Sequence, residues 1–122
     1  MSPPFILIMD QEKIPLDYPS ALDLLIFFGT EPIEEGDVTT YEVQDDSGLV
    51  LSFSFDTSEG SIQTIVKQYG RVVSLTSQEC LTRMWIDGDT FRAEFESGNY
   101  RITLAFKIYP FLQLKWSGLR VR

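Results

Sequence analysis

Residues 90–108 read TFRAEFESGNYRITLAFKI and contain the pattern that decides the fold. Apolar side chains occupy every second position, first from Phe91 to Phe95 and again from Tyr100 to Ile108. Because successive side chains of a strand point to opposite faces of a sheet, each half predicts a strand with one apolar and one polar face. Between them, Ser97-Gly98-Asn99 suits a tight turn, so the stretch predicts an antiparallel hairpin.

The same two-residue period continues on both sides of this hairpin. Leu51, Phe53 and Phe55 alternate with serines. Shorter apolar runs predict further strands at 62–66, 72–75, 80–86 and, beyond Pro110, 112–116. Turn signals recur about every ten residues, at 45–48, 58–60, 69–70, 87–89 and 97–99. We therefore expect roughly eight strands joined in sequence.

One short helix is expected before these strands. Ser20 can cap its start, Asp23 stands three residues further on, and Gly29 suits a left-handed exit. Leu22, Leu25 and Ile26 form an apolar stripe that we expect to face the core, although the helix is apolar almost all round.

Many short strands and one helix predict a mainly β protein of the α+β class. An antiparallel sheet curled over the helix, a small sandwich and a partly open barrel all fit this pattern. The 122 residues contain no repeat or linker, so we expect residues 1–122 to form a single domain.

The N-terminal residues and the cysteine content favour a cytoplasmic protein. Residues 5–9 read as a short strand, and no basic residue precedes this apolar run, which is unlike a signal peptide. No segment approaches the roughly 20 apolar residues that cross a bilayer, so we expect no membrane association. The single cysteine, Cys80, excludes an intramolecular disulfide, and we expect it in the core as a small apolar residue.

The sequence offers little catalytic chemistry. It contains no histidine, and its eight glycines form no phosphate-binding loop. Two carboxylate pairs remain, but Asp87 and Asp89 fit a hairpin turn, and Glu94 and Glu96 fit the polar face of a strand. We therefore expect no catalytic residues, no metal site, no cofactor and no enzymatic activity.

Charge is unevenly distributed along the chain. Residues 1–60 contain 13 acidic residues and one basic residue, whereas residues 61–122 contain nine basic and five acidic residues. An acidic surface repels nucleic acid and attracts a cationic protein. Acidic residues also simply aid solubility, which is the alternative interpretation.

An acidic loop at residues 31–37 is the candidate binding site. A solvated loop would explain it, but its carboxylates also suit a basic protein partner, with Tyr41 or an exposed Phe28 as an apolar anchor. The candidate partner-binding residues, including two in the next turn, are Glu31, Glu34, Glu35, Asp37, Asp45 and Asp46.

In size, charge and layout the chain resembles the small acidic immunity proteins that bacteria pair with their toxins. The resemblance rests on the acidic loop beside a compact β body that ends in residues 112–118, and on no diagnostic motif. It implies a non-enzymatic inhibitor that binds and occludes a cationic toxin.

Two other functions fit the same sequence. A β barrel would bind a small apolar ligand if its aromatic residues lined a pocket rather than a packed core. These residues are Phe53, Phe55, Phe91, Phe95, Phe106 and Trp116. A structural subunit of a larger assembly would use an unpaired edge strand or the apolar helix as its contact.

Overall fold

The computed structural model describes residues 16–120, which contain one helix and nine strands. Their bounds are α2 (Ala21–Phe28), β1 (Ile33–Glu35), β2 (Val38–Gln44), β3 (Val50–Asp56), β4 (Ser61–Gln68), β5 (Arg71–Gln78), β6 (Leu81–Asp87), β7 (Thr90–Ser97), β8 (Tyr100–Lys107) and β9 (Gln113–Arg120). The strand expected at residues 5–9 lies outside the described residues. Within residues 16–120, no helix is long and apolar enough to span a membrane.

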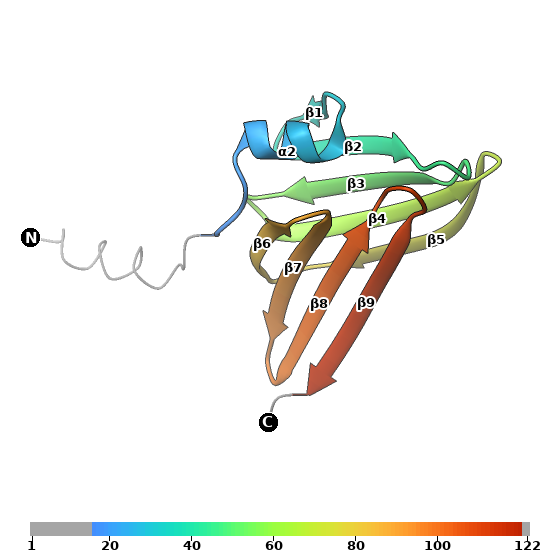
Figure 1. Ribbon diagram of the computed structural model, residues 1–122. Coiled ribbons are helices and arrows are strands. Elements are labelled where there is room, and N and C mark those ends of the chain that lie inside the picture. Colours follow the sequence, from blue (N-terminus) through green and yellow to red (C-terminus); the bar gives the residue numbers. More distant parts are fainter. Residues whose placement is uncertain (1–15, 121–122) are drawn as a thin grey trace, which may run out of the picture.

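The strands form two antiparallel sheets (Figure 1). The first has the order β1-β2-β3-β4-β5 and the second the order β6-β7-β8-β9, so within each sheet every strand pairs with its neighbour in sequence. The hairpin expected at residues 90–108 is formed by β7 and β8, where Phe91 pairs with Phe106. In the described part of the chain these sheets close no barrel, so the small sandwich is the arrangement found.

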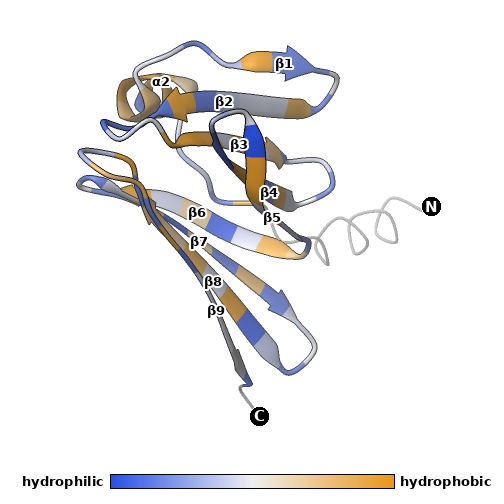
Figure 2. Ribbon diagram, turned by 90° about the vertical axis from the view of Figure 1, so that its right-hand side faces the viewer, coloured by the Kyte–Doolittle hydropathy of each residue, from blue (hydrophilic) through white to orange (hydrophobic). Residues whose placement is uncertain are grey.

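The apolar faces of the two sheets pack on each other, and their strands cross in direction (Figure 1). The alternation of hydrophobic and hydrophilic residues is visible as orange and blue bands along the ribbon of the second sheet (Figure 2). The ring of Phe53 in β3 lies 4.8 Å from that of Phe91 and 5.3 Å from that of Phe106, between ring centroids. Aromatic pairs at such distances add about 0.5–1.5 kcal/mol to the burial of their area, so these rings join the sheets.

One hydrogen bond between side chains also joins the two sheets. The indole Nε1 of Trp116 in β9 donates to Oγ1 of Thr64 in β4 over 3.1 Å. Thr64 is fully buried, and a buried hydroxyl without a partner costs about 1–3 kcal/mol. The bond therefore favours one placement of β9 against β4.

The ends of α2 confirm the expected capping residues. The Oγ of Ser20 accepts a hydrogen bond from the backbone N–H of Asp23 over 3.1 Å. Gly29 has a φ of 70°, and its N–H donates to the carbonyl oxygen of Leu25 over 2.8 Å. A left-handed φ is available to glycine without strain, which ends the helix there.

The helix face toward the core differs from the expected one. Leu24 and Phe28 are buried, whereas Leu22 and Ile26, which we expected to face inward, are 63% and 70% exposed. A helix that is apolar almost all round has no periodicity to fix its rotation. The rotation is set instead by Phe28, whose ring stacks on that of Tyr41 at a centroid distance of 4.4 Å.

Cys80 is exposed, so its expected place in the core is wrong. Strand β6 begins one residue later, at buried Leu81, and Cys80 itself has a φ of 68°. This residue, with its left-handed backbone, belongs to the turn that leads into the second sheet. It therefore lies outside the strand that was expected to bury it.

Replacing Phe106 by alanine should lower the free energy of unfolding by about 3–5 kcal/mol, because the side chain is 1% exposed and its removal leaves a cavity between the sheets. Tyr100→Ala on the same strand is the control. Its side chain is 52% exposed, and we expect a loss of at most about 1 kcal/mol. Urea denaturation measures both, and equal losses would contradict the packing described.

Candidate binding surface

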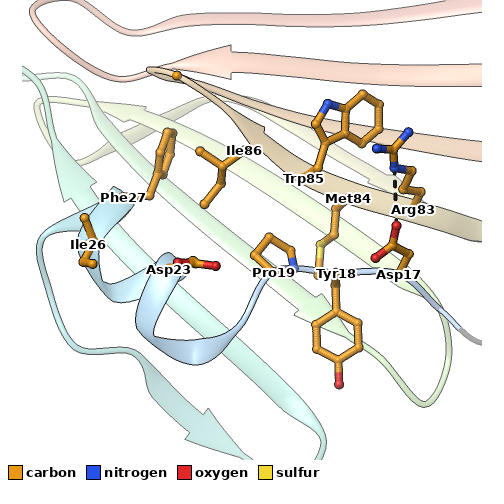
Figure 3. A pocket seen from close by; sticks show the side chains of 11 residues that line it. Asp17, Tyr18, Pro19, Asp23, Ile26, Phe27, Arg83, Met84, Trp85 and Ile86 are labelled. Atoms are coloured by element: carbon orange, nitrogen blue, oxygen red, sulfur yellow. Dashed lines mark ion pairs between the residues drawn. The ribbon is translucent and has the colours of Figure 1, made fainter.

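Helix α2 lies between two surface grooves. The first separates it from β6 and has a volume of about 550 Å³ (Figure 3). Asp17 and Arg83 form an ion pair there, with 3.5 Å between Oδ2 and Nε, and the guanidinium lies 4.1 Å from the centroid of the Trp85 ring. The cation that lines this groove therefore has its partners within the chain.

The second groove, which we call the acidic groove, lies between α2 and strands β1 and β2. Its volume is about 410 Å³, and Leu22 and Leu25 of the helix form part of its wall. Glu31 and Glu34 also line it. No Lys or Arg of the described residues forms an ion pair with either carboxylate. The chain therefore leaves the negative charge of this groove without a salt-bridge partner between residues 16 and 120.

Tyr41 also lines the acidic groove, although only 2% of its surface is exposed. Burial, and next the negative charges of Glu34 and Glu31, raise the pKa of its phenol above the usual value. Within residues 16–120 its hydroxyl has no hydrogen-bond partner, and because both carboxylates raise its pKa, the phenol lies near them at the groove. The groove therefore contains one neutral hydroxyl close to two carboxylates.

Strand register explains why only some acidic residues reach this groove. Glu34 pairs with Thr39, which pairs in turn with Phe55, and residues opposite each other in a ladder share a face of the sheet. Glu34 therefore lies on the face that α2 covers, while Glu35 projects to the opposite face. The acidic loop is divided between the two faces of the first sheet.

Asp37 lies at the turn between β1 and β2, on the same side of the molecule as the turn that follows β3. Its Oδ2 accepts a hydrogen bond from the Oγ of Ser58 over 3.2 Å. Asp56 pairs with Val38 beside it, and hydrogen bonds from the backbone of Glu59 and from Ser58 lower the pKa of its carboxyl. Asp56 and Glu59 thus extend the acidic surface at this end of the first sheet.

Asp45 and Asp46 lie at the opposite end of β2, so the six expected carboxylates do not form one continuous surface. β2 has seven residues and spans about 20 Å. Asp46 is exposed, but Asp45 is only 6% exposed and accepts hydrogen bonds from the backbone N–H groups of Ser47, Leu49 and Leu112. Because this carboxylate is used inside the fold, we leave Asp45 out of the surface proposed below.

The apolar part of the surface is also different from the one expected. Tyr41 and Phe28, the expected anchors, are both buried. The outward face of α2 instead exposes Leu22 and Ile26, four residues apart and thus adjacent on the helix. The spacing of Leu22 and Ile26 in the sequence already indicated a shared face of the helix, but we expected that face to be buried in the core. A second exposed apolar group, Val72, Val73 and Leu75, lies on the edge strand β5.

Three of the four carboxylates considered as acid–base pairs in the second sheet form surface ion pairs. Asp87 pairs with Arg92, Asp89 with Lys107 and Glu96 with Arg101, at 3.2, 3.5 and 3.4 Å. The part of the chain described contains no group of three residues arranged to hold a metal ion.

Two crossing antiparallel sheets with one capping helix and no closed barrel define this chain as a small β-sandwich protein. No protein-family model matches the sequence, and no curated protein matches it significantly. Among solved structures, it is similar to a chain of the contact-dependent growth inhibition toxin–immunity protein complex from Klebsiella pneumoniae 342. The similarity has a TM-score of 0.77 at 24% identity and covers 88% of this chain and all of the other. The two chains therefore share a fold.

Replacing Asp45 by asparagine should lower the free energy of unfolding at neutral pH by about 1.5–3 kcal/mol, because hydrogen bonds to a charged group are lost. Burial alone would raise the pKa of this carboxyl, but its hydrogen bonds from Leu112, Ser47 and Leu49 outweigh burial and lower the pKa. The ionised form therefore stabilises the fold above about pH 4, and this stabilisation is lost as the pH falls through the folded pKa.

Thermal unfolding of the Asp45→Asn variant and the wild type across pH 2.5–7 checks this expectation, with Asp46→Asn as the matched control on the exposed neighbour. A difference from wild type that stays constant down to the lowest pH would contradict it.

Proposed function

We propose that this chain is an immunity protein, which binds a bacterial toxin and neutralises it without catalysing a reaction. The observation that supports this most is the shared fold with a chain of a toxin–immunity complex, over the whole length of that chain. The resemblance noted from size and charge points the same way.

Chemistry favours the immunity half of such a complex over the toxin half. The sequence has no histidine to act as a general base. Asp87, Asp89 and Glu96, which belong to the conceivable acid–base pairs, are held in ion pairs and their side chains are more than half exposed. A net charge of −8 suits a protein that covers a basic surface.

The side of the molecule around α2 is the proposed toxin-binding surface. Leu22 and Ile26 supply an exposed apolar ridge, and Glu31 and Glu34 line the groove beside Leu22, as expected for an apolar centre with a polar rim. Glu31 and Glu34 line the groove beside α2, and we propose that Asp37, Glu35 on the opposite face of the sheet edge and the more remote Asp46 contribute charge to the same interaction. We propose a basic toxin domain as partner, action in the bacterial cytoplasm, and no role for nucleic acid, membrane or cofactor.

An immunity protein is expected to be encoded next to its toxin; co-expression with a toxin domain from an adjacent reading frame should then restore growth, and the two proteins should elute together from a sizing column. Expression of this chain alone is the control. Growth arrest by this chain alone would assign it to the toxin half, and failure of both rescue and co-elution would overturn the proposal.

The Glu34→Ser, Glu35→Ser, Asp37→Ser triple variant should associate with that partner more slowly than the wild type, and the wild-type rate should fall as salt rises. Exposed charges accelerate encounter through a field confined to about 8 Å at physiological ionic strength. Surface plasmon resonance measures the rates, with Glu94→Ser in β7 of the second sheet as the remote control. If association slows equally per charge in the control, this end of the first sheet does not steer the partner.

A further inference from the structure

The acidic groove combines three chemical features in one place. Its wall includes apolar Leu22 and Leu25, two carboxylates without an ion-pair partner among the described residues line it, and Tyr41 lines it close enough for both carboxylates to raise the pKa of its phenol. We propose that this groove receives a lysine or arginine side chain of the partner protein. The inference rests on the proposed function and assigns the residue type that the interface recognises.

The chemistry of the groove matches both parts of a long cationic side chain. The aliphatic stem of lysine or arginine packs on apolar surface while its charged head stays at a polar site. Here Leu22 and Leu25 would contact the stem, and Glu31 and Glu34 would accept hydrogen bonds from the head. Because the pKa of Tyr41 is raised, its phenol is neutral at physiological pH and its oxygen is a further acceptor.

The groove on the other side of α2 provides an internal comparison. There, Arg83 of the chain itself lies beside Asp17, 3.5 Å between Nε and Oδ2, and against the ring of Trp85. A guanidinium between a carboxylate and an aromatic ring is thus already present in this fold. Among residues 16–120, the acidic groove has no such cation, and a partner would supply it.

Other occupants fit the acidic groove less well. An anion would be repelled by Glu31 and Glu34. An apolar ligand would take both carboxylates out of water without a compensating charge, which is costly. A metal ion such as Ca²⁺ needs six to eight oxygen ligands, and residues 16–120 hold no group of three acidic, histidine or cysteine side chains in metal-binding geometry.

The groove is also held in shape before any partner binds. The ring of Tyr41 stacks on buried Phe28 at 4.4 Å, and the strand pairing of Glu34 with Thr39 fixes the direction of its side chain. Pro32 follows Glu31 and restricts its backbone. A preformed site loses less entropy on binding, so its contacts contribute more fully to affinity.

The test compares two double variants that remove the same charge. In Glu31→Gln, Glu34→Gln both carboxylates of the groove are neutralised, whereas in Glu35→Gln, Glu59→Gln two carboxylates outside the groove are neutralised, and all four residues are exposed. With the toxin domain encoded by the adjacent reading frame, we expect the first variant to lose at least about tenfold in affinity, mainly through faster dissociation. The control should change mainly the association rate, by less than about threefold.

Two further measurements separate recognition in the groove from a general effect of charge. Tyr41→Phe keeps the ring in the core and removes only the hydroxyl, and should weaken binding roughly 3- to 10-fold without a change in melting temperature. In the partner, alanine substitution of each Lys and Arg should reveal one residue whose effect disappears in the Glu31→Gln, Glu34→Gln background. Exchange of that residue between Lys and Arg then identifies the preferred head group.

The outcomes distinguish this inference from the proposed function. If the wild-type chain forms no complex, both are overturned. If the wild type binds but the groove and control variants bind equally well, or if no partner cation is coupled to Glu31 and Glu34, the groove inference alone is overturned.

Discussion

The contact between the rings of Phe28, Phe53, Phe91 and Phe106 is the interaction on which the rest of the structure depends. Phe28 comes from α2, Phe53 from the first sheet and the other two from the second. Phe28 lies 5.5 Å from Phe53 and 6.1 Å from Phe106, between ring centroids. The helix is thus fixed to both sheets at once, and the grooves on its two sides follow from that placement.

The acidic side chains of the first sheet divide into two physical kinds. Asp45 and Asp56 accept hydrogen bonds from backbone N–H groups and hold turns in place, so their charges serve the fold. Glu31 and Glu34 face a groove and form no ion pair with any residue between 16 and 120. The net charge of the chain does not distinguish these two kinds of carboxylate. The hydrogen bonds and the strand register do.

Most of the architecture was predictable from local sequence patterns. Alternation from Phe91 to Phe95, turn residues such as Gly98 and the capping residues Ser20 and Gly29 each act over a few residues, and the structure confirms them. The rotation of α2 was not predictable, because its sequence is apolar on nearly every side and the stacking of Phe28 on Tyr41 decides it. Likewise, Glu34 lies beside the start of β2 and Asp45 follows its end, so the length of this strand separates them. The alternation of apolar residues did not predict where β2 begins.

The two faces of α2 carry different constraints, and this separates folding from recognition. Leu24 and Phe28 face the core, so few substitutions there preserve the fold. Leu22 and Ile26 point outward, where most substitutions change stability by at most about 0.5 kcal/mol. A lineage of such proteins can therefore exchange the outer residues of α2 and the acids of the adjoining groove while keeping its core. Under the proposed function, specificity for a new partner can thus diverge on this scaffold without a new fold.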